Sequence, residues 1–165
     1  MTEKTRKNIA RAFAEESRVL AQMSPFILKA EREGYKELAR LFRAVENAKS
    51  IHARRFRLLM RGKIGSTRDN LSTALENEIK AKDRFYPQMI KEARDASTAV
   101  KKAFAQTSRT DEEYTDLFRS AMEDMLTDSE TVYYVCQICG HIHKNGRPER
   151  CPVCKAVPGR FKELK

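Results

Sequence analysis

The chain has 165 residues and a mass of 19.1 kDa, enough for one domain of ordinary size or for a medium domain with a small appendage. Hydrophobic residues make up 41% and charged residues 34%, with 6 Gly and 5 Pro, a composition that favours long helices over a turn-rich all-β fold. No run approaches about 18 apolar residues, and the start of the chain lacks the apolar stretch of a secretory signal. We therefore expect a cytoplasmic protein with no membrane partner.

The formal net charge of +10 and the sequence pI of about 9.6 raise the question of a nucleic-acid partner. Lys and Arg are mixed with Asp and Glu along the chain, without the block of like charges that grips phosphate. The excess also divides evenly, because residues 132–165 carry 7 Lys and Arg against 2 Asp and Glu, and residues 1–131 carry 26 against 21. We therefore do not expect nucleic-acid binding, whereas an acidic partner protein is compatible with the charge.

Four amphipathic stretches, in which apolar residues recur at spacings of three and four, are predicted to be helices. They cover residues 5–33, 36–61, 67–94 and 97–126, and the first ends next to Gly34, a good C-terminal cap. Each helix would be roughly 40 Å long. The short links between them predict an antiparallel four-helix bundle.

Polar residues interrupt the apolar stripe at the centre of each predicted helix. Charged side chains on a seam of Leu, Phe, Val and Met are costly unless they are paired or bind a metal. Extending the stripe through the four helix centres reaches, in chain order, Glu16, Lys49, His52, Glu78, Ala81, Asp111 and Tyr114. The apolar residues predicted to point inward on the first two helices include Phe26, Leu38 and Leu59.

These polar positions repeat along the chain at a constant offset. The pairs separated by 62 positions include Glu16 and Glu78, Lys49 and Asp111, His52 and Tyr114, and Pro25 and Pro87. We interpret the helices as a duplicated helical hairpin whose polar positions are related by a pseudo-twofold axis. The two prolines are predicted to bend their helices alike.

All four cysteines lie in the last 30 residues, as two Cys-x-x-Cys pairs with 11 residues between them: Cys136, Cys139, Cys151 and Cys154. Such pairs in a cytosolic chain indicate a metal site, because two knuckles close a tetrahedron of sulfur around one ion. Both iron and zinc take this geometry. The cysteines, with three of the six Gly and three of the five Pro, set residues 132–165 apart as a small domain after a helical domain of residues 1–131. We call the four cysteines together the four-cysteine site.

Three segments together resemble the rubrerythrin family. Residues 12–17 (Ala-Phe-Ala-Glu-Glu-Ser) are similar to its first-helix motif, Glu76-Asn77-Glu78 followed by Tyr86-Pro87 is similar to its third-helix motif, and the cysteine-rich tail is similar to its rubredoxin-like module. The resemblance covers essentially the whole chain, in the family's order. It implies a mainly α fold, an antiparallel four-helix ferritin-like bundle followed by a small metal-bound rubredoxin-like β domain. It also implies a di-iron centre that reduces hydrogen peroxide with electrons from the iron of the tail.

The tail carries the part of the resemblance that bears on the metal. Residues 133–156 are more similar to the rubredoxin-like module of rubrerythrins than to a nucleic-acid zinc ribbon, and Phe161 stands where that module places an aromatic ring over the site. The resemblance therefore favours iron at the four-cysteine site, with zinc as a substitute after expression in a foreign host. An ion held by four sulfurs has no open position, so that iron there would transfer single electrons. His141 and His143 are expected at the surface rather than among the ligands.

Four residues of the bundle keep a ligand atom at a position where the family has one. Glu16, His52 and Glu78 match ligands of the first, second and third helices, and Asp111 is a shortened substitute for the Glu of the fourth. Mixed oxygen and nitrogen ligands of this kind suit iron, manganese or zinc. One interpretation is therefore a single metal held by these four side chains.

Four other positions depart from the family pattern. Lys49 stands where the family has a bridging Glu, Ala81 where it has a second third-helix Glu, Tyr114 where it has a His, and Met23 where it often has a Tyr. A cation in place of a bridging anion favours a second interpretation, a buried salt-bridge network of Lys49 with the three carboxylates, to which His52 and Tyr114 add hydrogen bonds. The same cation disfavours a third interpretation, a working two-iron site. We expect the bundle site to be empty or to hold one metal rather than two irons.

The leading functional hypothesis is a rubrerythrin-like non-haem iron oxidoreductase and electron-transfer protein whose tail relays single electrons, with peroxide reduction in the bundle if that site binds metal. The alternative is an electron-transfer or metal-binding module whose bundle is a metal-free scaffold and dimerisation surface. A third hypothesis, a basic zinc-ribbon protein on nucleic acid, predicts a steep dependence of DNA binding on salt. The first two imply a redox partner protein. The resemblance further implies a homodimer in which the tail of one subunit approaches the bundle of another.

Overall fold

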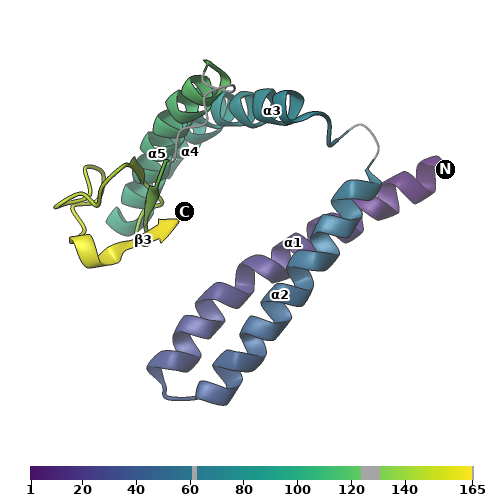
Figure 1. The fold of residues 1–165 in the computed structure, drawn as a ribbon, viewed down its shortest axis with the longest axis horizontal. Coiled ribbons are helices and arrows are strands. Elements are labelled where there is room, and N and C mark those ends of the chain that lie inside the picture. Colours follow the sequence, from purple (N-terminus) through teal and green to yellow (C-terminus); the bar gives the residue numbers. More distant parts are fainter. Residues whose placement is uncertain (61–62, 124–130, 165) are drawn as a thin grey trace. The chain divides into compact units, whose positions relative to one another are not determined.

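The computed structural model describes residues 1–60, 63–123 and 131–164, which fall into two compact units (Figure 1). The first unit is Met1–Ser66 and the second is Thr67–Lys165. Helices make up most of both units, and a small sheet follows at the C-terminal end of the second, which confirms the predicted mainly α class with a small β domain at its end. None of the helices in the described residues is long and apolar enough to cross a membrane.

The first unit is an antiparallel hairpin of two long helices, α1 (Glu3–Arg32) and α2 (Lys36–Leu59), which lie side by side (Figure 1). The chain reverses between them at Gly34, whose φ of 81° is a left-handed conformation that glycine adopts without strain. The N–H groups of Gly34 and Tyr35 both donate to carbonyls of the last turn of α1, which closes a Schellman motif. Residue 61, the predicted end of the second helix, lies outside the described residues.

Contact between α1 and α2 buries only part of their apolar surface. The hydrophobic residues buried between them are Met23, Ile27, Ala30, Ala39 and Ala53. Phe26, Leu38 and Leu59, which are predicted to point inward, are each at least 45% exposed. Two helices alone can bury only part of each other's apolar face, so that the hairpin keeps exposed apolar surface on which a further partner could pack.

The third predicted helix is divided in the structure. Its segments are α3 (Thr67–Lys80), the π-helix η1 (Ala81–Phe85), α4 (Tyr86–Glu92) and the 3₁₀-helix η2 (Ala93–Asp95). Pro87 has no N–H to donate to the preceding turn, and it closely follows the π-helix, where the hydrogen-bond register changes. Pro25 lies inside the continuous α1. The two prolines therefore have different local helix geometry, although the repeat predicts that they act alike.

The fourth predicted helix is α5 (Thr98–Glu123), which packs against α3 and α4 and completes a second hairpin. Thr110, Asp111 and Thr115 are buried on α5, and the two threonine hydroxyls donate to carbonyls of the preceding turn of their own helix. Residue 126, the predicted end of this helix, lies outside the described residues. The face of α5 that packs against α3 and α4 thus includes a buried carboxylate at its centre.

The C-terminal segment folds as a three-stranded antiparallel sheet in the order β2–β1–β3. Its elements are β1 (Tyr133–Cys136), β2 (Ile142–Lys144) and β3 (Phe161–Leu164), the last preceded by the 3₁₀-helix η3 (Pro158–Arg160). The register places Cys136 opposite Phe161, and both are buried with Cys151 in a small core. β2 contacts α5, so that the sheet and the second hairpin belong to one unit. The domain boundary after residue 131 stays a prediction.

Candidate metal centres

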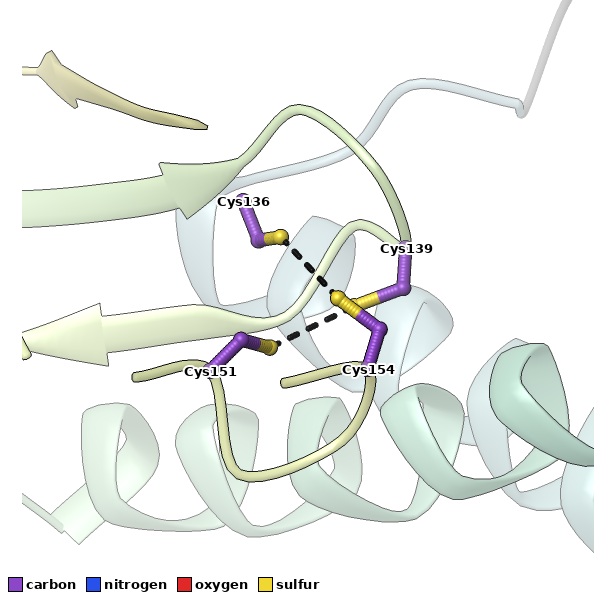
Figure 2. Close-up of side chains that lie close together, drawn as sticks. All are labelled: Cys136, Cys139, Cys151 and Cys154. Carbon is purple, nitrogen blue, oxygen red and sulfur yellow. Dashed lines mark hydrogen bonds between the residues drawn. The ribbon is translucent and has the colours of Figure 1, made fainter. Parts of the chain in front are cut away.

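The four cysteine side chains converge on one point (Figure 2). Their sulfur atoms all lie within 4.8 Å of one another, and the Sγ atoms of Cys136 and Cys154, like those of Cys139 and Cys151, are 3.6 Å apart. A metal bound to four sulfurs at about 2.3 Å in a tetrahedron requires sulfur–sulfur distances of about 3.8 Å. The donor set therefore fits a single tetrahedral ion. All four cysteines are free thiols rather than disulfides.

Two matching backbone loops present these sulfurs. The first knuckle, residues 136–141, is closed by a hydrogen bond from the N–H of Gly140 to the Cys136 carbonyl. The second knuckle, residues 151–156, is closed in the same way from Lys155 to Cys151. Gly140 and Lys155 each follow the second cysteine of a pair, and both have positive φ, 84° and 65°. The Cys-x-x-Cys spacing thus folds twice into one local structure, because the left-handed residue turns each loop back on itself.

The electrostatics of the four-cysteine site favour a bound cation. Burial raises the pKa of the Cys139 thiol well above its ordinary value, and the sulfurs of Cys154, Cys151 and Cys136 raise it further. Burial also opposes ionisation of Cys151, but the backbone N–H groups of Cys154 and Val153, together with the thiols of Cys139 and Cys154, outweigh it and lower the pKa of this thiol. The backbone thus prepares one thiolate, whereas four adjacent thiolates need a positive ion among them.

The first knuckle lies against α5 through two adjacent residues of that helix. The hydroxyl of Tyr114 donates to the Gly140 carbonyl at 2.6 Å, and Nδ1 of His141 lies 2.5 Å from Oε2 of Glu113. His141 is 6% exposed, so that the prediction of a surface position is wrong for this residue. Its burial depends on α5, a tertiary contact that the local sequence does not reveal. His143 is half-buried on β2.

Glu113 is the residue of this contact that sequence reasoning missed. It lies one position before Tyr114, off the apolar stripe, where an acidic residue is ordinarily solvated, and no sequence signal singles it out. Tyr114 also differs from its predicted role. Instead of joining a polar network in the bundle, its hydroxyl donates to the tail.

Three of the predicted bundle residues meet in the first unit. Nζ of Lys49 lies 3.0 Å from Oε2 and 3.2 Å from Oε1 of Glu16, and Nδ1 of His52 lies 3.2 Å from Oε2 of the same carboxylate. The hydrogen bond from Lys49, with a smaller contribution from His52, lowers the pKa of Glu16 below its ordinary value. Lys49 therefore pairs with one of the carboxylates that the salt-bridge interpretation assigns to it.

The other two predicted ligands meet in the second unit. Asp111 is 7% exposed, and burial raises the pKa of its carboxyl. Burial also raises the pKa of Glu78, on the facing helix α3, and the charge of Asp111 raises it further. Within the described residues, no hydrogen bond or ion pair reaches the Asp111 carboxylate. The four candidate bundle ligands thus form two pairs, one in each unit.

Comparison with known proteins agrees with this architecture. Residues 134–162 match the family described as the rubredoxin-like domain of rubrerythrin. Nigerythrin of Nitratidesulfovibrio vulgaris is 26% identical, over 91% of this chain and 81% of that protein, and rubrerythrin of Porphyromonas gingivalis is 25% identical, over 98% and 90%. The solved structure of nigerythrin in a mixed-valence state matches 97% of this chain and 86% of its own, with a TM-score of 0.57 and 25% identity. The tail thus matches the rubredoxin-like domain of rubrerythrin, and the chain as a whole is similar to rubrerythrins and nigerythrin.

The similarity to rubrerythrins supports the two candidate metal centres unequally. A rubredoxin-like domain with four converging cysteines supports iron binding at the four-cysteine site. The departures of Lys49, Ala81 and Tyr114 from the family's ligand pattern stay predictions. Ala81 lies in the π-helix η1 and has no ligand atom. The structure thus describes a complete set of four sulfur ligands in the tail, and only one pair of candidate metal ligands in each helical hairpin.

Proposed function

We propose that this protein is a rubrerythrin-like non-haem iron oxidoreductase whose four-cysteine site holds one iron. The comparisons support the coarser statement, an iron-binding protein of electron transfer or peroxide reduction. The observation that carries the proposal is the set of four sulfurs at tetrahedral spacing. Bound there, iron supplies one-electron redox chemistry without an open coordination position.

The residues around the four-cysteine site suit an electron relay more than a reaction centre. Cys136 and Cys151 are buried, and Phe161 covers them. Cys139 and Cys154 are only partly buried, so that one side of the site stays accessible to a redox partner. The chain's own residues therefore hold the ion rigidly, exclude water from one side and leave the other near the surface.

For the helical site, we propose that Lys49 takes the place of a metal ion. Its ammonium group already balances Glu16, and Ala81 and Tyr114 provide no ligand where the family pattern has one. We expect this part of the protein to hold no metal or one, and not two irons.

A second candidate function, peroxide reduction at a single metal, has one observation in its favour. Asp111 is a buried carboxylate to which the described part of the chain gives no cation, and Glu78 lies close enough for its pKa to respond to that charge. A metal held by these two carboxylates would satisfy them. If the protein binds no metal beyond the four-cysteine site and consumes no peroxide, this second function is excluded and the electron-transfer function remains.

We also propose that the protein is a cytoplasmic homodimer with an acidic redox partner. Residues 1–66 carry 16 Lys and Arg against 7 Asp and Glu, whereas residues 67–131 carry 10 against 14. Helical hairpins of opposite charge with exposed apolar side chains would associate between copies. The mass from light scattering tests this, and a monomer at micromolar concentration would contradict it. The cytoplasm fits because its reducing conditions keep the four cysteines free to bind metal.

The experiment for the main proposal is expression of the full chain in iron-rich, oxygen-limited medium, followed by elemental analysis and absorption spectroscopy. We expect one iron per chain at the four-cysteine site, a red ferric form, and at most one further metal. Zinc at the same site would give a colourless protein with one metal. Absence of any bound metal would overturn the proposal.

A further inference from the structure

Where α5 contacts the first knuckle, the Tyr114 side chain leaves no room for a side chain at Gly140. The Tyr114 hydroxyl lies 2.6 Å from the Gly140 carbonyl, and a Cβ atom added at Gly140 would lie 2.9 Å from that hydroxyl. The φ of Gly140 is 84°. Both the backbone conformation and the approach of the phenol thus require the absence of a side chain at this position. Gly140 directly follows Cys139, a member of the four-cysteine site.

The same tyrosine also faces the carboxylate pair of the second unit. Tyr114 and Asp111 are three residues apart on α5 and therefore share a helix face. Burial raises the pKa of the Tyr114 hydroxyl. A hydrogen bond with Thr110 offsets part of this rise, and the charges of Asp111, Glu78 and Cys139 add to it. The phenol therefore lies within electrostatic reach of the four-cysteine site and of the carboxylate pair.

We propose that Tyr114 is a positioning residue that docks the four-cysteine site onto α5, the helix that carries Asp111. Its hydroxyl holds the first knuckle at a fixed distance from the Glu78–Asp111 pair, with the contact between Glu113 and His141 as a second attachment. The docking itself does not need iron, but its role in setting the electron path rests on the proposed function.

The first knuckle has two described side-chain attachments to α5, one through Tyr114 and one through Glu113. The bonds from Cys139 through the Gly140 carbonyl to Tyr114 form a continuous path with a single hydrogen bond in it. The position where the family pattern has a histidine ligand thus belongs to the attachment of the tail.

The variant that tests the docking is Tyr114→Phe, which keeps the ring and removes the hydroxyl. The matched control is Tyr86→Phe, because Tyr86 lies in the same unit and its pKa responds to the same two carboxylates, but no bond from it to the tail is present among the described residues. Zinc-loaded full-length protein is used for amide hydrogen exchange, so that the readout does not depend on redox activity. Loss of one hydrogen bond should speed exchange in residues 136–144 about three- to tenfold.

A second readout separates positioning from mere stability. The hydroxyl hydrogen directs a positive partial charge at the first knuckle, which favours the more negative ferrous state of an iron bound by four thiolates. In the iron-loaded full chain, we expect Tyr114→Phe to lower the reduction potential while the unfolding midpoint of the helices stays that of the control.

The two measurements fail in distinguishable ways. Unchanged exchange in residues 136–144, relative to Tyr86→Phe, would overturn the docking whatever metal is bound. Faster exchange with an unchanged or raised potential would overturn the positioning role. A chain that binds zinc but never iron would remove the proposed function, and the exchange result would still decide the docking.

Discussion

The buried carboxylate of Asp111 allows a sharp test of the second unit. Asp111 is 7% exposed, and burial raises the pKa of its carboxyl above the value of about 3.9 expected in the unfolded chain. The folded state therefore binds this proton more tightly than the unfolded state does. Stability falls as pH rises from the unfolded pKa through the folded one, and the loss is complete above both values. At neutral pH, an ionised Asp111, to which the described residues bring no cation, destabilises the fold.

Substitution of Asp111 by Asn removes the charge and nearly keeps the shape. A buried amide without a partner still costs about 1–3 kcal/mol, but a buried carboxylate without one costs more, so that Asp111→Asn should be more stable at neutral pH, by on the order of 1 kcal/mol. The advantage should shrink as the pH falls through the raised pKa of the wild-type carboxyl. Urea unfolding followed by the helical circular dichroism signal, on protein with one zinc per chain, measures both effects.

The matched control is Asp116→Asn, on the same helix. The Asp116 side chain is 74% exposed and pairs with Arg119 at the surface, so that its loss should change stability by less than about 0.5 kcal/mol. A variant Asp111→Asn that is less stable than wild type at neutral pH would refute the reasoning. It would mean that a cation pairs with Asp111 in the native protein, as the single-metal interpretation requires.

Two further substitutions have defined outcomes. Cys136→Ser removes one of the four sulfurs, and we expect loss of the bound iron and faster proteolysis of the tail, because so small a core depends on its metal. Elemental analysis and limited digestion measure these two effects. Full metal content in the variant would contradict the four-cysteine site. Lys49→Ala removes the main cause of the lowered Glu16 pKa. An NMR titration of the Glu16 carboxyl carbon should show that pKa rising, while the exposed Lys7→Ala should leave it in place.

The helices and the four-cysteine site could be predicted because both are local patterns. Apolar spacing of three and four marks α1, α2 and α5 within a few residues of their observed bounds, and Cys-x-x-Cys places two sulfurs on one loop. The π-helix before Pro87 has no comparable pattern, since periodicity does not distinguish it from an α-helix with a proline.

Tertiary contacts account for the parts that the sequence could not supply. His141 resembles a surface residue beside a cysteine pair, and only the approach of α5 buries it against Glu113. Helical phase correctly brought Lys49 and Glu16 to one face of the first hairpin. It placed Tyr114 on the bundle face as well, but a phenol is long enough to reach beyond its helix, and its hydroxyl bonds to Gly140.

Lys49 and Tyr114, two of the positions that depart from the ligand pattern implied by the resemblance, have other bonds in this chain, and this predicts what restoring one ligand would do. In Tyr114→His, the shorter imidazole would not reach the Gly140 carbonyl, which the phenol oxygen meets at 2.6 Å. Lys49 would still balance Glu16, and Ala81 would still lack a ligand atom. We therefore expect faster hydrogen exchange in the first knuckle and no additional iron per chain, measured by mass spectrometry and elemental analysis. A gain of two irons on the helices would show instead that this one position had kept the di-iron site from forming.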